Sequence, residues 1–220
     1  MKLAFIGRGN VGTALSTGLA RAGHEVRFGH RDPKEPVQAA AGWGEVIFLA
    51  VPFSGVEEAV RGIGRAADGK VLVDVTNALD QHMDLAIGFS TSGAEELQKK
   101  VPAARVVKAF NTVFAQNQSS GRVGNEQLTA FVAGDDPEAK GVVMRLASDI
   151  GFDPVDTGPL KSARYLEPMG IMMIWSRVHA WNGDRDWVSP GKEIIPTFLR
   201  SITSHRIGDH RSFSVQNLIF

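Results

Sequence analysis

The chain has 220 residues and carries 24 Lys and Arg against 24 Asp and Glu, so its formal net charge is zero. That balance excludes a general electrostatic attraction to nucleic acid or to an anionic membrane. The absence of Cys excludes disulfides, thiolate nucleophiles and zinc–thiolate sites. A hydrophobic content of 43% and a charged content of 22% are those of an ordinary soluble globular protein. No signal-peptide pattern precedes the first apolar run, and the densest one, residues 169–175, is too short to span a bilayer, so we expect a cytoplasmic protein.

The first residues form the pattern around which the rest of the chain is arranged. The apolar run 2–6 has the length and composition of a buried parallel strand, and the next strand is expected at 25–29. Between them lies a G-x-G-x-x-G turn that opens directly into a helical pattern. This strand–turn–helix context is the one in which a dinucleotide pyrophosphate binds, although a glycine turn that serves only packing is the alternative. The residues predicted to bind the cofactor here are Gly7, Arg8, Gly9, Asn10, Val11 and Gly12.

The segment after the second strand, His30-Arg31-Asp32, bears on the choice of nicotinamide cofactor. In NAD enzymes an acidic side chain about twenty residues past the last glycine binds the ribose 2′-hydroxyl. Alignment on the strand entry places His30 at that position with Arg31 beside it, and together with Arg8 they would bind a 2′-phosphate. A literal count from Gly12 reaches Asp32 instead, which would favour NAD, and a third possibility is that all three are plain loop residues. We predict NADP.

Residues 33–44 are too few for the helix and third strand of a full nucleotide-binding half, so we expect a shortened helix and a missing or vestigial strand. The apolar run 45–51 predicts the central strand, which Pro52 ends because proline lacks an N–H. Ligands of such sheets lie beyond the carboxyl ends of the strands. Ala50, Val51 and Pro52 are therefore expected to border the cofactor.

Two later strands lead to asparagine. A strand expected at 70–75 is followed by Asn77, and one expected at 104–109 is followed by Asn111. Because both positions lie at carboxyl ends, we expect both side chains to face the nicotinamide. The alternatives are that Asn77 forms a hydrogen-bonded turn and that Asn111 caps the segment after it.

Helical and strand patterns alternate through the rest of residues 1–157. Helices are expected at 54–67, 93–100 and 137–150, the last capped by Asp135 or Asp136, and strands at 128–133 and 152–156. The alternation predicts an α/β fold of the Rossmann type, a doubly wound, mostly parallel sheet with a C-terminal helical extension. We expect residues 1–157 to form the dinucleotide-binding domain and residues 158–220 to form a helical region with an irregular tail.

The C-terminal region opens with one long helix, expected at 162–181, that is apolar on most sides. Such a helix is buried on several faces, so we expect the sheet to cover one face and the second subunit of a homodimer another, with the acceptor site as a further use. Arg164 and Glu167 are three residues apart and are expected to pair on its surface. The lone tyrosine, Tyr165, is expected to pack. The pattern from Asn182 onward is irregular and predicts no role.

Seven segments carry a family resemblance: IGRGNVGTAL, GHEVRFGHR, VIFLAVP, DVTNALD, KAFNTVFA, VAGDDPEAK and GFDPVDTGPLKSARYLEP. Together they resemble the NADP-dependent oxidoreductases of the 8-hydroxy-5-deazaflavin coenzyme, their bacterial dinucleotide-binding relatives, and the cytoplasmic reductase domain of six-transmembrane ferric reductases. The resemblance covers roughly residues 1–181. It implies that NADPH lies along the sheet and passes hydride to a flat acceptor held by the C-terminal region. By motif it implies a 2′-phosphate segment at Arg8, His30 and Arg31. It implies a nicotinamide side at residues 50–52 and Asn77.

The predicted function is that of an NADPH-dependent oxidoreductase that transfers hydride between NADP(H) and a flat redox acceptor such as a deazaflavin or a flavin. Hydride transfer between planar rings depends on positioning, so no catalytic residue and no metal ligand is predicted. One alternative is reduction of a small carbonyl or imine, which needs a proton donor that Asn77 and Asn111 cannot supply. The other is a non-catalytic sensor that binds NADP.

Overall fold

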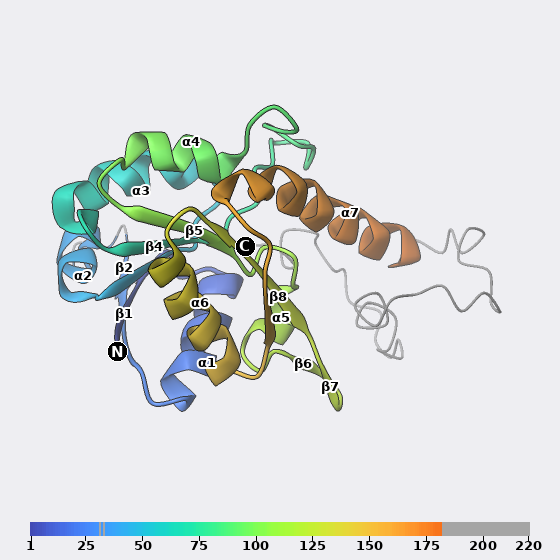
Figure 1. The fold of residues 1–220 in the computed structure, drawn as a ribbon, viewed down its shortest axis with the longest axis horizontal. Coiled ribbons are helices and arrows are strands. Elements are labelled where there is room, and N and C mark those ends of the chain that lie inside the picture. The colour runs from blue at the N-terminus through green and yellow to red at the C-terminus, as the bar shows by residue number, and fades with distance from the viewer. Residues whose placement is uncertain (31, 33, 182–220) are drawn as a thin grey trace.

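The computed structural model describes residues 1–30, 32 and 34–181, which form a twisted sheet with helices on both faces (Figure 1). Five strands are parallel: β1 (Lys2–Ile6), β2 (Glu25–Gly29), β3 (Val46–Leu49), β4 (Val71–Asp74) and β5 (Arg105–Ala109). Strand β8 (Thr129–Gly134) runs antiparallel to β5, and β9 (Asp153–Asp156) is parallel to β8. The order across the sheet is β2-β1-β3-β4-β5-β8-β9. The predicted Rossmann-type, mostly parallel sheet is confirmed.

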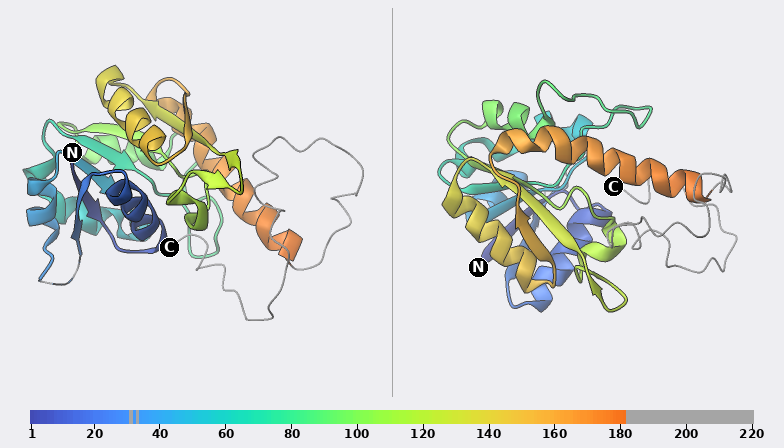
Figure 2. Two further views of the ribbon diagram at one scale, coloured as in Figure 1. Left: turned by 90° about the horizontal axis from the view of Figure 1, so that it is seen from below. Right: turned by 45° about the vertical axis from the view of Figure 1, so that its right-hand side comes forward.

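Helices bury both faces of this sheet, which is why the central strands β1 and β3 are nearly continuous apolar runs. On one face lie α1 (Asn10–Arg21) and α6 (Pro137–Asp149), and on the other α2 (Val37–Trp43), α3 (Val56–Ile63) and α4 (Gly93–Lys100) (Figure 2). Successive residues of β1 alternate between the two cores: Leu3 and Phe5 pack with α1 and α6, whereas Ala4 and Ile6 pack with the other three helices. Short 3-10 turns precede and follow α3, at η1 (Phe53–Gly55) and η2 (Gly64–Ala67), and another, η3 (Leu160–Ser162), precedes the last helix.

The short segment between β2 and β3 determines one edge of the sheet. Helix α2 has seven residues, and β3 pairs with β1 rather than with β2. Among the strands of the described chain, β2 therefore stands at the edge with no strand outside it. The expected short helix and missing third strand are confirmed.

The connection from β5 to β8 contains a short helix, α5 (Ala115–Gln118), and a two-stranded hairpin of β6 (Arg122–Val123) and β7 (Glu126–Gln127). Antiparallel strands need no long crossover helix between them, and this compact connection returns the chain alongside β5 in the opposite direction.

Helix α6 follows β8 in the sequence, and Asp136 caps it by accepting the N–H of Ala139 at 2.7 Å. Of the two predicted caps, Asp136 is thus the one observed.

Helix α7 (Ala163–Trp181) begins beside α4 and extends beyond the sheet, as the orange ribbon in Figure 1 shows. Its Met173 and Ile174 pack against Leu79 and Phe114, so one face is buried, but by the segments that follow β4 and β5 rather than by the strands of the sheet as predicted. Tyr165 is 71% exposed, so the packing predicted for it is wrong. Across the described chain, no helix is both long and apolar enough to cross a membrane. The tail from residue 182, for which no role was predicted, lies outside the described residues.

Candidate cofactor site

A cavity of about 740 Å³ runs along the carboxyl ends of the parallel strands, from the glycine turn after β1 to α7. Its volume lies within the range of about 300–1,000 Å³ found for small-molecule and cofactor sites. Two predicted cofactor residues, Asn10 and Gly12, do not line it, and Arg31 lies outside the described residues. The predicted residues that do line the cavity are Gly7, Arg8, Gly9, Val11, His30, Ala50, Val51, Pro52, Asn77 and Asn111.

The glycine turn brings the backbone of β1 against the end of β3. Gly7 has a φ of +105°, and a Cβ there would collide with the carbonyl oxygen of Ala50 and lie 2.9 Å from Val51 Cγ1. Only glycine adopts this conformation and approach without strain. A Cβ on Gly12 would lie 2.7 Å from the Gly7 carbonyl oxygen, so Gly12 serves the packing of helix against strand behind the cavity. Gly7 therefore forms part of the cavity wall, whereas Gly12 allows close packing of the helix against the strand.

Helix α1 begins at the cavity with Gly9 as its N-cap, and no side chain caps it within the described chain. Its first turn contains no acidic residue. The backbone N–H groups of a first helical turn have no partner within the helix, and the helix dipole places partial positive charge there. This end of the cavity is therefore suited to phosphate.

Cationic side chains lie where the cavity reaches β2. The Arg8 guanidinium stands over the Phe28 ring, 5.1 Å from its centroid, and its Nη1 lies 3.4 Å from the Glu35 carboxylate. Arg8 is more than half exposed, so this ion pair is solvent-screened and Arg8 remains accessible to an anion. His30 lines the same end at the close of β2. Two of the three residues predicted to bind a 2′-phosphate therefore lie together.

Asp32, the residue that would have favoured NAD, does not line the cavity. Its Oδ1 accepts the backbone N–H of Lys34 at 2.9 Å, which makes it part of a tight turn. The literal count of twenty residues from the last glycine therefore reaches a turn residue and not a cavity residue.

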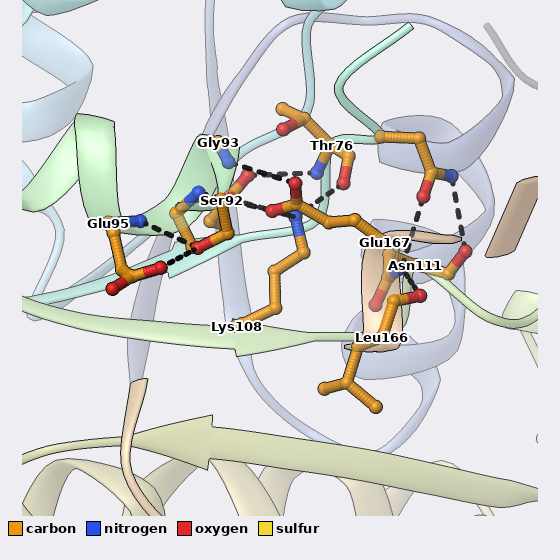
Figure 3. Close-up of polar contacts among 11 residues, drawn as sticks. Thr76, Ser92, Gly93, Glu95, Lys108, Asn111, Leu166 and Glu167 are labelled. Atoms are coloured by element: carbon orange, nitrogen blue, oxygen red, sulfur yellow. Dashed lines mark hydrogen bonds and ion pairs between the residues drawn. The ribbon is translucent and has the colours of Figure 1, made fainter. Parts of the chain in front are cut away.

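Asn77 and Asn111 meet across the ends of β4 and β5. Figure 3 labels Asn111 among its polar contacts. Asn77 Nδ2 donates to the Asn111 carbonyl at 3.1 Å, and Asn111 Nδ2 donates to Asn77 Oδ1 at 3.0 Å. Asn111 Nδ2 also donates to the carbonyl of Leu166 on α7 at 2.8 Å, while its buried Oδ1 has no partner among the described atoms. These two residues, here called the asparagine pair, join β4, β5 and α7 at one end of the cavity.

Helix α7 can approach the asparagine pair this closely because residue 170 is glycine. A Cβ on Gly170 would lie 2.7 Å from Asn77 Oδ1 and 2.9 Å from the Asn111 carbonyl oxygen. Both distances are well below van der Waals contact. Gly170, Met173 and Ile174 line the cavity together, being spaced three and four residues apart on one face of the helix.

The backbone turns sharply at the end of β5. Phe110 has a φ of +66° although it is a bulky residue, and it is 1% exposed. Its carbonyl accepts Gln118 Nε2 at 2.7 Å, and its ring packs edge-on against Phe152 at 5.7 Å. A non-glycine residue held in this region costs about 1–3 kcal/mol and persists when its surroundings hold it there. This turn directs Asn111 toward the cavity.

The sequence did not single out several lining residues: Thr76, Thr112, Val113, Phe114, Gly170, Met173 and Ile174. The first four flank the two predicted asparagines, so the strand-end argument could have been extended to them. For α7, one glycine among bulky apolar residues was a usable signal of close approach.

The predicted pairing of Arg164 with Glu167 is wrong. Arg164 forms a two-pronged ion pair with Glu95 of α4, both contacts at 2.8 Å, and this hydrogen bonding lowers the pKa of the Glu95 carboxyl. Glu167 is 1% exposed and faces the ends of α4 and β5. The spacing rule assumes a helix surface open to solvent, whereas this part of α7 lies against α4.

Comparison with known proteins agrees with this geometry. The sequence model of the family described as coenzyme F420-dependent NADP oxidoreductase matches residues 2–43 and 34–78. A metalloreductase, STEAP3 of Rattus norvegicus, is 34% identical over 189 residues, which are 79% of this chain and 38% of the relative. The chain thus spans well under half the length of that relative. The F420-dependent NADP reductase of Methanothermobacter marburgensis is 28% identical over 206 residues and is covered over 91% of its length.

A solved structure extends the comparison to the whole fold. The crystal structure of an Arthrobacter sp. FB24 protein, assigned as an F420-dependent NADP-reductase, superposes with a TM-score of 0.75 at 30% identity. The match covers 83% of this chain and 95% of that one. The chain therefore belongs to the coenzyme F420-dependent NADP oxidoreductase family, whose members are NADP-dependent oxidoreductases.

Proposed function

We propose that the cavity binds NADPH and that the chain transfers hydride between this cofactor and a flat redox acceptor, a deazaflavin or a flavin. The observation that carries the proposal is the continuity of one cavity from the glycine turn, past the asparagine pair, to the face of α7 that bears Gly170. A dinucleotide needs that length, because its pyrophosphate lies at a helix N-terminus and its nicotinamide beyond the strand ends. The relatives named for an F420-dependent NADP reductase support a deazaflavin as the acceptor.

The residues present fit NADP. Glycine at positions 7 and 9 places no side chain at the start of α1, and the N-terminus of that helix, which no described side chain caps, suits a pyrophosphate. In the proposal, Arg8 and His30 bind the 2′-phosphate together with Arg31, and residues 50–52 border the ribose and nicotinamide. The asparagine pair lines the cavity, and its side-chain amides are of the kind that can hydrogen-bond a carboxamide. When bound, the cofactor supplies a hydride at its nicotinamide ring.

The side chains at the α7 end favour hydride transfer alone over reduction of a carbonyl or imine. The described lining residues with ionisable side chains are Arg8, His30 and Glu58, all from the part of the cavity formed by the glycine turn, β2 and α3. Around the asparagine pair and α7, the described lining carries amides, hydroxyls and apolar groups. Tyr165, the one tyrosine of the chain, is not among the lining residues. A carbonyl or imine reductase needs a positioned proton donor, whereas two stacked rings need position and a dry pocket.

The roles of the two regions follow from this arrangement. Residues 1–157 would hold NADPH, and α7 with the chain after it would seat the acceptor, form a homodimer contact, or do both. Tyr165 and Met172 are both exposed and lie two helical turns apart on α7. They give the helix an outer surface that a second subunit could cover. We further propose that the protein acts in the cytoplasm.

The proposal is tested by NADPH binding and oxidation with and without a deazaflavin, with FMN and ferric chelates as comparators. The proposal predicts rapid oxidation with the deazaflavin. Oxidation with ferric chelates alone would instead match the metalloreductase relatives, and tight binding without turnover on any acceptor would indicate a sensor. The variant Arg31→Glu should weaken NADPH far more than NADH, and an equal loss for both would mean that Arg31 does not bind the 2′-phosphate.

A further inference from the structure

A lysine is buried in the middle of the sheet, on β5, three residues before Asn111. Lys108, on β5, has 0% of its side chain exposed. Its Nζ lies 2.9 Å from Asp74 Oδ2, 3.0 Å from Glu167 Oε1 and 2.6 Å from the carbonyl oxygen of Thr76 (Figure 3). The two carboxylates are each 1% exposed. Lys108, Asp74 and Glu167, here called the buried triad, thus join β5, β4 and α7.

The triad has one positive and two negative charges, and a helix end balances the excess. Glu167 accepts the backbone N–H groups of Gly93 at 2.8 Å and Ala94 at 3.1 Å, at the start of α4. Those N–H groups and the positive end of the helix dipole stabilise a carboxylate. Each hydrogen-bonding direction of the Lys108 ammonium is therefore used, and the cluster is satisfied although it is buried.

The same contacts reach the asparagine pair on both sides. Asp74 Oδ1 accepts the N–H of Thr76 at 2.9 Å while Lys108 donates to the carbonyl of Thr76, so the triad holds the peptide directly before Asn77. On α7, Leu166 and Glu167 are consecutive. The Leu166 carbonyl holds Asn111, and the Glu167 carboxylate holds Lys108.

We infer that the buried triad is a positioning device for the nicotinamide end of the cavity, acting through Thr76 and Leu166 on the asparagine pair. A buried ion cluster adds little net stability compared with apolar packing of the same volume, so its presence here is better explained by the geometry that it imposes. The inference rests on the proposed function, because it assigns the asparagine pair to the nicotinamide half of NADPH.

The triad does not itself supply a proton. Burial alone would lower the pKa of Lys108, but Asp74 and Glu167 outweigh it, and the pKa of the ammonium is raised above its ordinary value. Lys108 thus stays charged, and it does not line the cavity. Its role is confined to holding other groups.

An ion pair outside the triad also links α7 to α4 and provides a matched control. Arg164 and Glu95 also join α7 to α4, with both contacts at 2.8 Å, but their hydrogen bonds to each other involve neither Thr76 nor the asparagine pair. If the triad only fastens α7 to α4, removal of either link should have the same consequence. If it positions the asparagine pair, only the triad variants should affect the nicotinamide half of a bound cofactor.

The test compares two ligands of the full chain by calorimetric titration: NADPH, and 2′,5′-ADP, which carries the adenosine half without the nicotinamide. For Glu167→Gln and Asp74→Asn we expect the NADPH dissociation constant to rise about tenfold. That is the change expected when one well-formed hydrogen bond between the protein and the nicotinamide half is lost. The dissociation constant of 2′,5′-ADP should change by less than about twofold, because this ligand lacks the nicotinamide half of NADPH, where the hydrogen bond would be lost. Arg164→Met should leave both constants unchanged.

The outcomes separate the two proposals. If both triad variants bind NADPH as the wild type does, or if Arg164→Met reproduces their loss, the positioning role is refuted. If the triad variants lose both ligands together, the triad maintains the fold as a whole and the positioning role is again refuted. If the wild-type chain itself does not bind NADPH, the proposed function fails first, and the inference with it.

Discussion

The substitution Gly170→Ala tests whether the close approach of α7 sets the geometry of the cavity. An added Cβ would lie 2.7 Å from Asn77 Oδ1 and 3.0 Å from Asn111 Nδ2. Ordinary contacts between carbon and its neighbours begin at about 3.5 Å, so α7 or the asparagine pair must move by about half an ångström or more.

The stability and activity effects should differ in size. Alanine in place of glycine inside a helix stabilises it by about 1 kcal/mol. Loss of the hydrogen bonds between the two asparagines costs about 1 kcal/mol for each bond. The free energy of unfolding should therefore fall by no more than about 1–2 kcal/mol. A misplacement of the bound nicotinamide approaching one ångström costs about a hundredfold in rate, or about 2.7 kcal/mol of activation free energy.

The assay is kcat/KM for NADPH oxidation with a deazaflavin, measured beside thermal denaturation. Gly141→Ala is the matched control, because Gly141 also lies inside a helix, α6, but a Cβ there would meet nothing within 4 Å. It should raise stability by about 1 kcal/mol without changing the rate. The reasoning is refuted if Gly170→Ala oxidises NADPH as fast as the wild type, or if Gly141→Ala slows it equally.

Three further substitutions test other parts of the site. Gly7→Ala should abolish NADPH binding in a titration, because its φ of +105° and the Ala50 carbonyl leave no place for a Cβ; retained affinity would mean that the turn does not hold the pyrophosphate. Arg8→Gln should weaken NADPH about tenfold relative to NADH, as expected for one charge-assisted contact with a phosphate; an equal loss for both cofactors would contradict this role. Asp136→Ala should lower the free energy of unfolding by about 1 kcal/mol through loss of the α6 cap, with an unchanged NADPH dissociation constant. A changed constant would show that α6 influences the cavity.

Those parts of the fold that depend on local pattern could be read from the sequence. Buried parallel strands are continuous apolar runs, which can be recognised in the sequence. Ligands lie beyond the carboxyl ends of such strands, so residues 50–52, Asn77 and Asn111 could be placed at the cavity from the sequence alone. The short interval after β2 likewise predicted the missing third strand, because a dozen residues cannot hold both a helix and a strand.

Contacts that depend on tertiary packing could not be read in the same way. The spacing of Arg164 and Glu167 predicts a surface pair, but α4 lies against that part of α7. Arg164 pairs with Glu95 of α4, and Glu167 accepts a backbone N–H at the start of α4. Lys108 stood in an apolar strand, which is a signal of a buried charge, yet its partners come from residues 34 and 59 positions away in sequence, on β4 and α7. Only the assembled fold brings Lys108 to these two carboxylates and the start of α4 to Glu167.

The most direct test of the central claim is the fate of a deuterium label at C4 of the NADPH nicotinamide during oxidation by a deazaflavin in water. The account predicts that the label from one face of the ring appears on the reduced deazaflavin, because both rings would lie in the one cavity that the asparagine pair and the Gly170 face of α7 line together. Loss of the label to water, or NADPH binding without oxidation, would contradict it.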